Sequence, residues 1–188
     1  MNKKANTYKV TIAALLIAIG ILIPMISPLK IILEPASFTL ASHVATMIAM
    51  FLSPAIAAAV AIGTAFGFLL GGFPIVIALR AASHVIFAFV GAKILSRRPN
   101  ILQNQKSFWM FNLSLGILHA LCEVIVVSLF YFSGNLSSDY YNQGMLMSVM
   151  LLVGVGTVVH SMVDFWLAKI VWKTVGKQSR VKSTSYIK

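Results

Sequence analysis

The sequence predicts an all-α membrane protein with six transmembrane helices and with both termini in the cytoplasm. Three observations lead to this fold class. Hydrophobic residues make up 59% of the 188-residue chain, well above the roughly 45 to 50% apolar share of soluble domains. The apolar residues fall into six runs, most of them close to the roughly 20 residues that a membrane span requires. The basic residues gather in those connections that would face one side of the membrane.

The distribution of positive charge gives the predicted orientation. Of the 15 Lys and Arg residues, all except Lys30 and Arg80 lie near the two termini or near the connection at 96–106. Because cytoplasmic connections carry an excess of Lys and Arg, these segments are expected inside the cell. The formal net charge of +11 therefore reflects topology. No nucleic-acid partner is expected, since such a partner requires a basic patch on a folded soluble face.

The first helix is expected at about 8–27. Its basic start imitates a signal peptide, but the apolar run is longer than a typical signal-peptide core, so we interpret it as a first span. Ala14 and Ala18 within it form a small-xxx-small pattern that allows another helix to approach closely. The following segment, 28–35, is too short to span and is interrupted by charge and proline. It is expected to form a lid-like outer loop.

The next three helices follow one another through tight turns. The second is expected at 36–52 and carries His43, and Pro54 marks the turn after it. The third, at 55–70, is rich in Ala and Gly, which favours close helix contact. A Gly-Gly turn leads into the fourth helix at 74–95, which begins with a proline, as first helical turns often do.

The fifth helix is expected at 108–132 and is followed by a polar outer loop. The sixth, at 145–172, is longer than one span requires, which indicates that it tilts or extends beyond the bilayer. Residues 173–188 are expected to form a flexible, basic cytoplasmic tail. We interpret residues 1–188 as a single membrane domain. The only cysteine is Cys122, so no intrachain disulfide can form.

Ionisable residues inside these apolar runs indicate a functional site. Arg80 and His84 lie one helical turn apart in the fourth run. A charge at the middle of a membrane helix costs roughly 2.5 to 3.5 kcal/mol, so such a residue needs a partner or a function. Two further helices carry pairs at spacing i, i+4, each on one helix face: His119 with Glu123, and His160 with Asp164. We expect Arg80 and Glu123 to pair. A purely structural role of this pair is an open alternative.

Motifs for several chemistries are absent from the sequence. It contains no Gly-x-x-x-x-Gly-Lys-[Ser/Thr] loop, so the chain is not expected to hydrolyse ATP, and no His-Glu-x-x-His motif. No enzyme activity, cofactor or resident metal is expected. Two other function classes are open alternatives. One is an autonomous small-solute transporter, although no internal repeat is visible. The other is a metal-dependent intramembrane hydrolase, with ligands from His119, Glu123, His160 and Asp164.

Three features together resemble one family over nearly the whole chain. They are the small-residue pattern at Ala14 and Ala18, the outer loop after the first helix, and the polar residues on the last three helices. The sequence is similar to the substrate-binding S-components of energy-coupling factor (ECF) vitamin transporters. This resemblance implies a protein of the bacterial cytoplasmic membrane that binds a vitamin from outside. It further implies docking, through the first helix, on a membrane coupling subunit driven by two ATPase subunits, with release inside when the S-component topples.

Within that family, residues 33–43 and 71–74 look most like the niacin-type members. A small carboxylate vitamin is therefore favoured, and the sequence leaves niacin and pantothenate open. A planar guanidinium can hold a carboxylate through two hydrogen bonds. The expected substrate-binding residues are Arg80, His84, His119, Glu123, His43, Tyr131 and His160. Aromatic residues near the outer rim are expected to stack on the ligand or to close the lid: Phe38, Phe73, Phe130, Tyr131, Tyr140 and Tyr141.

Overall fold

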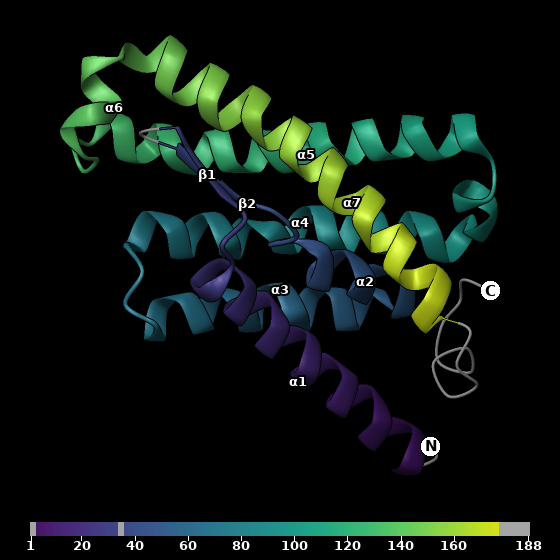
Figure 1. Ribbon diagram of the computed structural model, residues 1–188. Helices are drawn as coiled ribbons and strands as arrows, with labels where there is room; N and C mark the ends of the chain where they lie inside the picture. The colour runs from purple at the N-terminus through teal and green to yellow at the C-terminus, as the bar shows by residue number, and fades with distance from the viewer. Residues whose placement is uncertain (1–2, 34–35, 177–188) are drawn as a thin grey trace.

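A computed structural model describes residues 3–33 and 36–176 as a helical bundle with one short hairpin (Figure 1). Its helices are α1 (Lys3–Ile26), α2 (Val44–Leu52), α3 (Pro54–Leu70), α4 (Ile75–Arg97), α5 (Gln105–Phe132), α6 (Ser138–Asn142) and α7 (Gly156–Val175). A 3-10 turn, η1 (Pro99–Leu102), precedes α5, and a π-helical segment, η2 (Leu146–Val155), leads directly into α7. The hairpin consists of β1 (Lys30–Leu33) and β2 (Ala36–Thr39).

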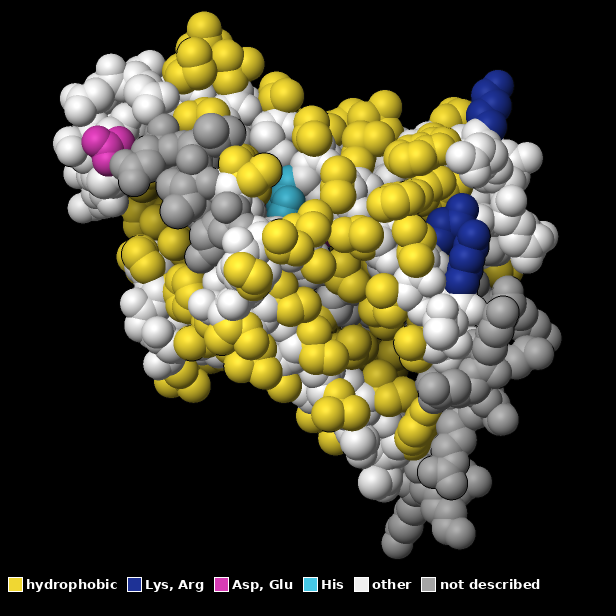
Figure 2. Space-filling model, viewed as in Figure 1, with side chains coloured by type: hydrophobic (Ala, Val, Ile, Leu, Met, Phe, Trp, Pro, Cys, Tyr) yellow, Lys and Arg dark blue, Asp and Glu magenta, His cyan; other side chains and the backbone are white. Residues whose placement is uncertain are grey.

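Among the described residues, four helices are long and apolar enough to cross a membrane: Thr7–Ile26, Ile75–Arg97, Gln105–Phe132 and Leu146–Val175. A fifth, Pro54–Leu70, is apolar but shorter. Hydrophobic side chains also cover most of the face seen in Figure 2. Because soluble monomers rarely expose apolar surface on this scale, the exterior fits a lipid environment. The structure thus agrees with the prediction of a helical membrane protein.

The second predicted helix is wrong in its first half. Residues 36–39 form β2, which pairs antiparallel with β1 in the register Lys30↔Thr39. A turn follows in which Ala41 has a φ of 67°, a conformation that a right-handed helix cannot contain. α2 therefore begins only at Val44 and, at nine residues, rises about 14 Å. That is about half of the roughly 30 Å hydrocarbon core.

Short as it is, α2 lies at the centre of the bundle. It packs against α1, α3, α4 and α7, and eight of its nine residues are buried. The ring of Phe51 near its end lies 5.8 Å from that of Phe165 and 5.3 Å from that of Trp172, both on α7. This packing explains why α2 is apolar on nearly all sides, as expected of a helix with no lipid- or water-facing stripe.

α1 packs along α3 through small residues. Gly63 lies against the side chain of Ile17, and Gly67 lies one turn further along α3 against the next turn of α1. The face of α1 that carries Ala14 and Ala18 points elsewhere, and both alanines are exposed. Ala14 and Ala18 therefore do not take part in helix packing within the described part of the chain.

The two ends of the described chain lie on the same side of the bundle. In Figure 1, the start of α1, the end of α7 and the connection from α4 to α5 are all on the right, while α6 and the turn from α3 to α4 are on the left. On the face shown in Figure 2, Lys and Arg side chains lie at that right-hand end, and the acidic side chain lies at the other. The gathering of basic side chains at the end where the described chain starts and finishes is the one expected from the sequence.

Candidate small-molecule binding site

A cavity of about 120 Å³ lies between β2, α2, α3, α4, α5 and α7. Its polar lining includes Ser42, His43, Arg80, His84, Glu123, Thr157 and His160. Its apolar lining includes Pro24, Phe38, Phe68, Phe73 and Ile77. Drug-sized ligands occupy pockets of roughly 300 to 1,000 Å³, so this cavity suits a smaller molecule that combines an apolar body with polar ends.

Glu123 on α5 is the polar centre of the site. One of its oxygens, Oε2, accepts hydrogen bonds from Nη2 of Arg80 and from Oγ1 of Thr157, both at 2.7 Å. The other, Oε1, lies 3.1 Å from Nε2 of His84 and 3.6 Å from Nε2 of His119. Only 3% of the residue is exposed. The predicted ion pair between Arg80 and Glu123 is confirmed, and its geometry meets the requirement that a buried charge be both paired and hydrogen-bonded.

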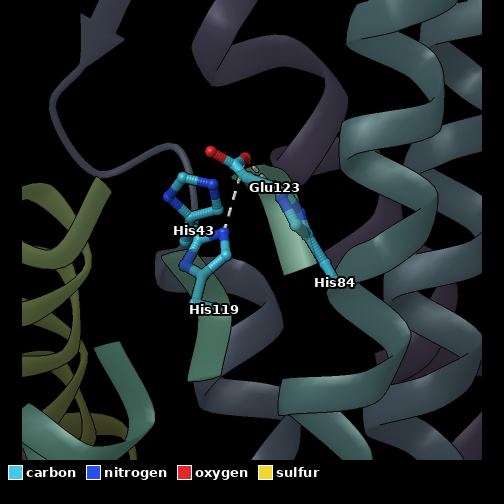
Figure 3. A group of neighbouring side chains, drawn as sticks. All are labelled: His43, His84, His119 and Glu123. Carbon is cyan, nitrogen blue, oxygen red and sulfur yellow. Dashed lines mark hydrogen bonds and ion pairs between the residues drawn. The ribbon is translucent and has the colours of Figure 1, made fainter. Parts of the chain in front are cut away.

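Three imidazole rings surround this carboxylate (Figure 3). The ring centroids lie 4.8 Å apart for His43 and His84, 4.7 Å for His43 and His119, and 4.6 Å for His84 and His119, all edge to face. The rings come from the residue before α2, from α4 and from α5, so the tertiary fold brings them together. The structure thus gathers five of the predicted site residues, Arg80 included, into one cluster.

His160 completes the polar wall from α7. Its Nε2 lies 3.0 Å from Oγ of Ser42 and 3.4 Å from Oδ2 of Asp164. The ring of Phe38, on β2, lies 5.6 Å from the imidazole ring. His160 therefore links the hairpin to the interior of the cavity, next to His43, whose ring lies 5.0 Å away.

One face of α7 holds the cluster in place. Thr157, Ser161 and Asp164 are spaced i, i+4, i+7, so they lie on one stripe of the helix. Thr157 donates to Glu123, and Oγ of Ser161 lies 3.1 Å from Nδ1 of His119. Thr157 and Ser161 are not predicted from the sequence, because single hydroxyls are common in apolar helices. Their spacing relative to Asp164 is the signal that would have identified them.

Tyr131 does not line the cavity. Its ring packs on that of Tyr141 at 4.8 Å, and its carbonyl oxygen accepts a hydrogen bond from the Tyr141 hydroxyl. Tyr131 lies eight residues beyond Glu123 on α5, which corresponds to about 12 Å along the helix axis. Tyr131 therefore lies at a different depth along α5 from the cluster around Glu123. Of the aromatic residues expected at the rim, Phe38 and Phe73 do line the cavity.

Tyr140, on α6, is buried rather than exposed at the rim. It packs with η2 and α5 in an apolar cluster that includes Val127 and Val149. Burial raises the pKa of its hydroxyl, because the phenolate form is disfavoured away from water. Tyr140 therefore stays neutral and closes the bundle next to the Arg80 end of the site.

Several polar atoms around the cavity have unused hydrogen-bonding capacity. Within the described part of the chain, Nε of Arg80, Oγ1 of Thr64 and Nε2 of His119 are buried and have no hydrogen-bond partner. Most buried polar atoms in folded proteins are paired, so each exception calls for an explanation. Arg80 and Thr64 both line the cavity, where a ligand could supply the partner.

The four residues considered for a hydrolase metal site fall into two groups. The ligand atoms of His119 and Glu123 lie within 4.8 Å of those of His43 and His84, whereas His160 and Asp164 form a separate group with His43. The predicted set of four therefore does not converge on one point. His43 is the residue that the two groups share.

An apolar exterior and a small, partly open cavity with charged and polar residues in its wall are typical of a membrane-embedded protein that binds a small molecule. The chain is 46% identical over 167 residues to the niacin transporter NiaX of Lactococcus lactis subsp. cremoris (strain MG1363), an alignment that covers 89% of this chain and 74% of NiaX. The chain belongs to the NiaX family, and the resemblance to niacin-type S-components is confirmed. No family model matches the chain. No solved structure matches it either.

Proposed function

We propose that this protein is the substrate-capture subunit of an ATP-driven ECF-type importer and that it binds niacin, in its acid form, from the outside. The likeness to the niacin transporter NiaX supports the substrate. The observation that carries the proposal is the position of Arg80, a guanidinium on the wall of a small buried cavity with one nitrogen on Glu123 and another, Nε, without a partner.

The geometry of Arg80 suits a carboxylate ligand. A guanidinium has five donors in a planar fork, so one edge can stay on Glu123 while another engages the substrate. His84, which lines the cavity, would then face the ring of the vitamin, whereas His119 is fully buried and is not among the lining residues. The small cavity favours a single-ring acid over the longer, flexible pantothenate chain, because a flexible ligand also loses more conformational entropy when it binds.

The proposed topology has six membrane segments with both termini in the cytoplasm. α2 is the short second segment, which the hairpin of β1 and β2 precedes on the outer side. The proposal rests on the Lys and Arg residues, which by the positive-inside rule mark the side of the termini as cytoplasmic. The host membrane is then the bacterial cytoplasmic membrane, with the cavity loaded from the hairpin side.

The proposed partners are a membrane coupling subunit and two ATPase subunits. The sequence contains no phosphate-binding loop of its own, so we propose that ATP is hydrolysed by another chain. Ala14 and Ala18 are exposed on α1 and would allow a partner helix to approach closely. The docking surface is therefore proposed on the face of α1 that carries these two alanines.

The test is ligand identification followed by calorimetry on the purified full chain. Mass spectrometry of the protein as purified is expected to detect niacin. Nicotinate is expected to bind with at least tenfold higher affinity than nicotinamide or pantothenate, because only nicotinate combines a single ring with a carboxylate. Absence of nicotinate binding to a monodisperse, folded sample would overturn the proposal, and so would equal affinity for the amide.

A further inference from the structure

We propose that His43, His84, His119 and Glu123 form a binding site for a divalent transition-metal ion at the inner wall of the cavity. One ligand atom from each residue lies within 4.8 Å of the corresponding atoms of the other three. Figure 3 shows the three rings arranged around the carboxylate. Three imidazole nitrogens with one carboxylate oxygen are a donor set that suits Zn²⁺ and its neighbours, Co²⁺ and Ni²⁺.

The distances inside the cluster are close to those that a metal requires. With metal–ligand bonds of about 2.0 to 2.2 Å, neighbouring ligands of a tetrahedral ion lie roughly 3.3 Å apart. Oε1 of Glu123 lies 3.1 Å from Nε2 of His84 and 3.6 Å from Nε2 of His119. Two of the ligand pairs thus already have the required spacing. The ligand atom of His43 lies within 4.8 Å of the other three.

Hydrogen bonds behind the rings fix which nitrogen faces the cluster. Nδ1 of His43 lies 3.1 Å from Oδ2 of Asp164, and Nδ1 of His119 lies 3.1 Å from Oγ of Ser161. Metal-binding histidines commonly use one ring nitrogen for such a support and present the other to the metal. In both rings this arrangement leaves Nε2 for the ion.

A second observation points to a ligand at this position. Nε2 of His119 has no hydrogen-bond partner among the described residues, although the side chain is fully buried. Its contact with Oε1 of Glu123, at 3.6 Å, is longer than a hydrogen bond, and a buried polar atom without a hydrogen bond is costly. A metal ion between His119 and Glu123 provides that partner.

The neighbouring group of His43, His160 and Asp164 is the weaker candidate. Oδ1 of Asp164 already accepts a hydrogen bond from the backbone N–H of Ala41 at 2.8 Å, and Oδ2 accepts one from the N–H of His43 at 2.9 Å. With both oxygens occupied, Asp164 acts as the support of a metal ligand rather than as a ligand. The ion is therefore assigned to the group that contains Glu123.

The charges around the site also favour binding of a metal cation first and of an acidic ligand after it. Arg80 is ion-paired with Glu123, and Asp164 is a second buried carboxylate, next to His43. A divalent ion would reverse this excess of negative charge and so favour an acidic ligand in the cavity. If the proposed function holds, the pyridine nitrogen of nicotinate has the chemistry to add a fifth ligand to the ion, while Arg80 holds the carboxylate.

The experiment is calorimetric titration of the chelator-treated, vitamin-free full chain with Zn²⁺, together with metal analysis. Wild type is expected to bind one ion per chain. His84→Gln and His119→Gln are each expected to weaken metal binding by tenfold or more. His160→Gln, which removes a ligand of the neighbouring group only, is expected to keep metal binding. Melting temperature and size-exclusion profile show whether each variant is folded. Wild type loaded with Co²⁺ is expected to show the visible absorption of a tetrahedral site, a readout that depends on no variant.

Three results would overturn the metal site: no stoichiometric binding by wild type, wild-type affinity in both glutamine variants, or loss of binding in His160→Gln alone. Titrations of nicotinate with and without Zn²⁺ separate this proposal from the proposed function. Nicotinate binding without any metal binding overturns the metal site and leaves the function standing. Metal binding without nicotinate binding supports the metal site and overturns the function.

Discussion

Asp164 on α7 holds His43, 121 residues away in sequence, by accepting two hydrogen bonds from it, one from its backbone N–H at 2.9 Å and one from its Nδ1 at 3.1 Å. The same carboxylate accepts a hydrogen bond from the N–H of Ala41, the residue with the positive φ. One fully buried side chain therefore fixes both the turn that precedes α2 and the orientation of a cavity-lining ring.

Replacing Asp164 with Asn is expected to destabilise the protein. The amide keeps the shape of the side chain, but it has only one acceptor oxygen where the carboxylate has two. A buried N–H of the turn is then left unpaired, which costs roughly 1 to 3 kcal/mol. Thermal unfolding of the purified protein measures the effect as a lower melting temperature.

The matched control is Asp139→Asn, a change of the same type in the first turn of α6. It is expected to leave the melting temperature within the small range that is typical of surface substitutions. An Asp164→Asn protein that melts with the wild type would show that the turn before α2 does not depend on this carboxylate.

The sequence predicts those features that depend on local pattern. The long spans follow from apolar length, and the pairs His119–Glu123 and His160–Asp164 follow from helical spacing. The Arg80–Glu123 ion pair follows from the cost of an unpaired charge in a membrane. None of these inferences requires knowing in advance which helices are neighbours. The ion pair requires only that a charge inside a membrane has a partner.

The features that the sequence does not predict depend on tertiary contacts. Apolar residues at 36–43 are equally compatible with a helix, a strand or a buried turn, so the start of α2 could not be placed. The link from His43 to Asp164 depends on the packing of α2 against α7. Tyr131 was assigned to the site for its chemistry, whereas the rise of α5 places it at another level.

Trp at Ala14 or Ala18 is expected to abolish uptake of labelled nicotinate by cells without affecting its binding to the purified protein. Both alanines are exposed on α1, so an indole there fits the isolated chain but blocks close approach of a partner helix. Uptake in whole cells and calorimetry on the same variants measure the two properties separately.

The control for this prediction is Ala59→Trp, because Ala59 is also exposed, on α3, and lies outside the proposed docking face. This variant is expected to keep uptake. Normal transport by Ala14→Trp would remove the docking role from α1. Loss of transport in Ala59→Trp as well would show that any bulky residue on the exterior is disruptive.

The proposed orientation predicts opposite accessibility at the two ends of the bundle. In a Cys122→Ala background, a cysteine at Ser138 in α6 is expected to react with a membrane-impermeant maleimide in intact cells. A cysteine at Ser96, near the exposed end of α4, is expected to react only after permeabilisation. The opposite pattern at both positions would invert the topology and place the cavity entrance on the cytoplasmic side.

The role of Arg80 can be tested with a substitution that keeps its charge. Lys at this position retains the positive charge but loses the planar fork, so it cannot engage Glu123 and a ligand carboxylate through separate edges. We expect nicotinate binding to weaken by roughly 1.5 to 3 kcal/mol, the range for a charge-assisted hydrogen bond, or about ten- to a hundredfold. Calorimetry on folded protein measures this loss.

The decisive comparison is a cycle of nicotinate and nicotinamide against wild type and Arg80→Lys. If Arg80 contacts the carboxylate, the variant has already lost that interaction, so removing the carboxylate from the ligand costs little more. The two losses are then strongly non-additive, as expected for groups in direct contact. If the losses add instead, the guanidinium does not touch the substrate. Its 2.7 Å contact with Glu123 would then be its whole function, as a buried pair that sets the register of α4 against α5.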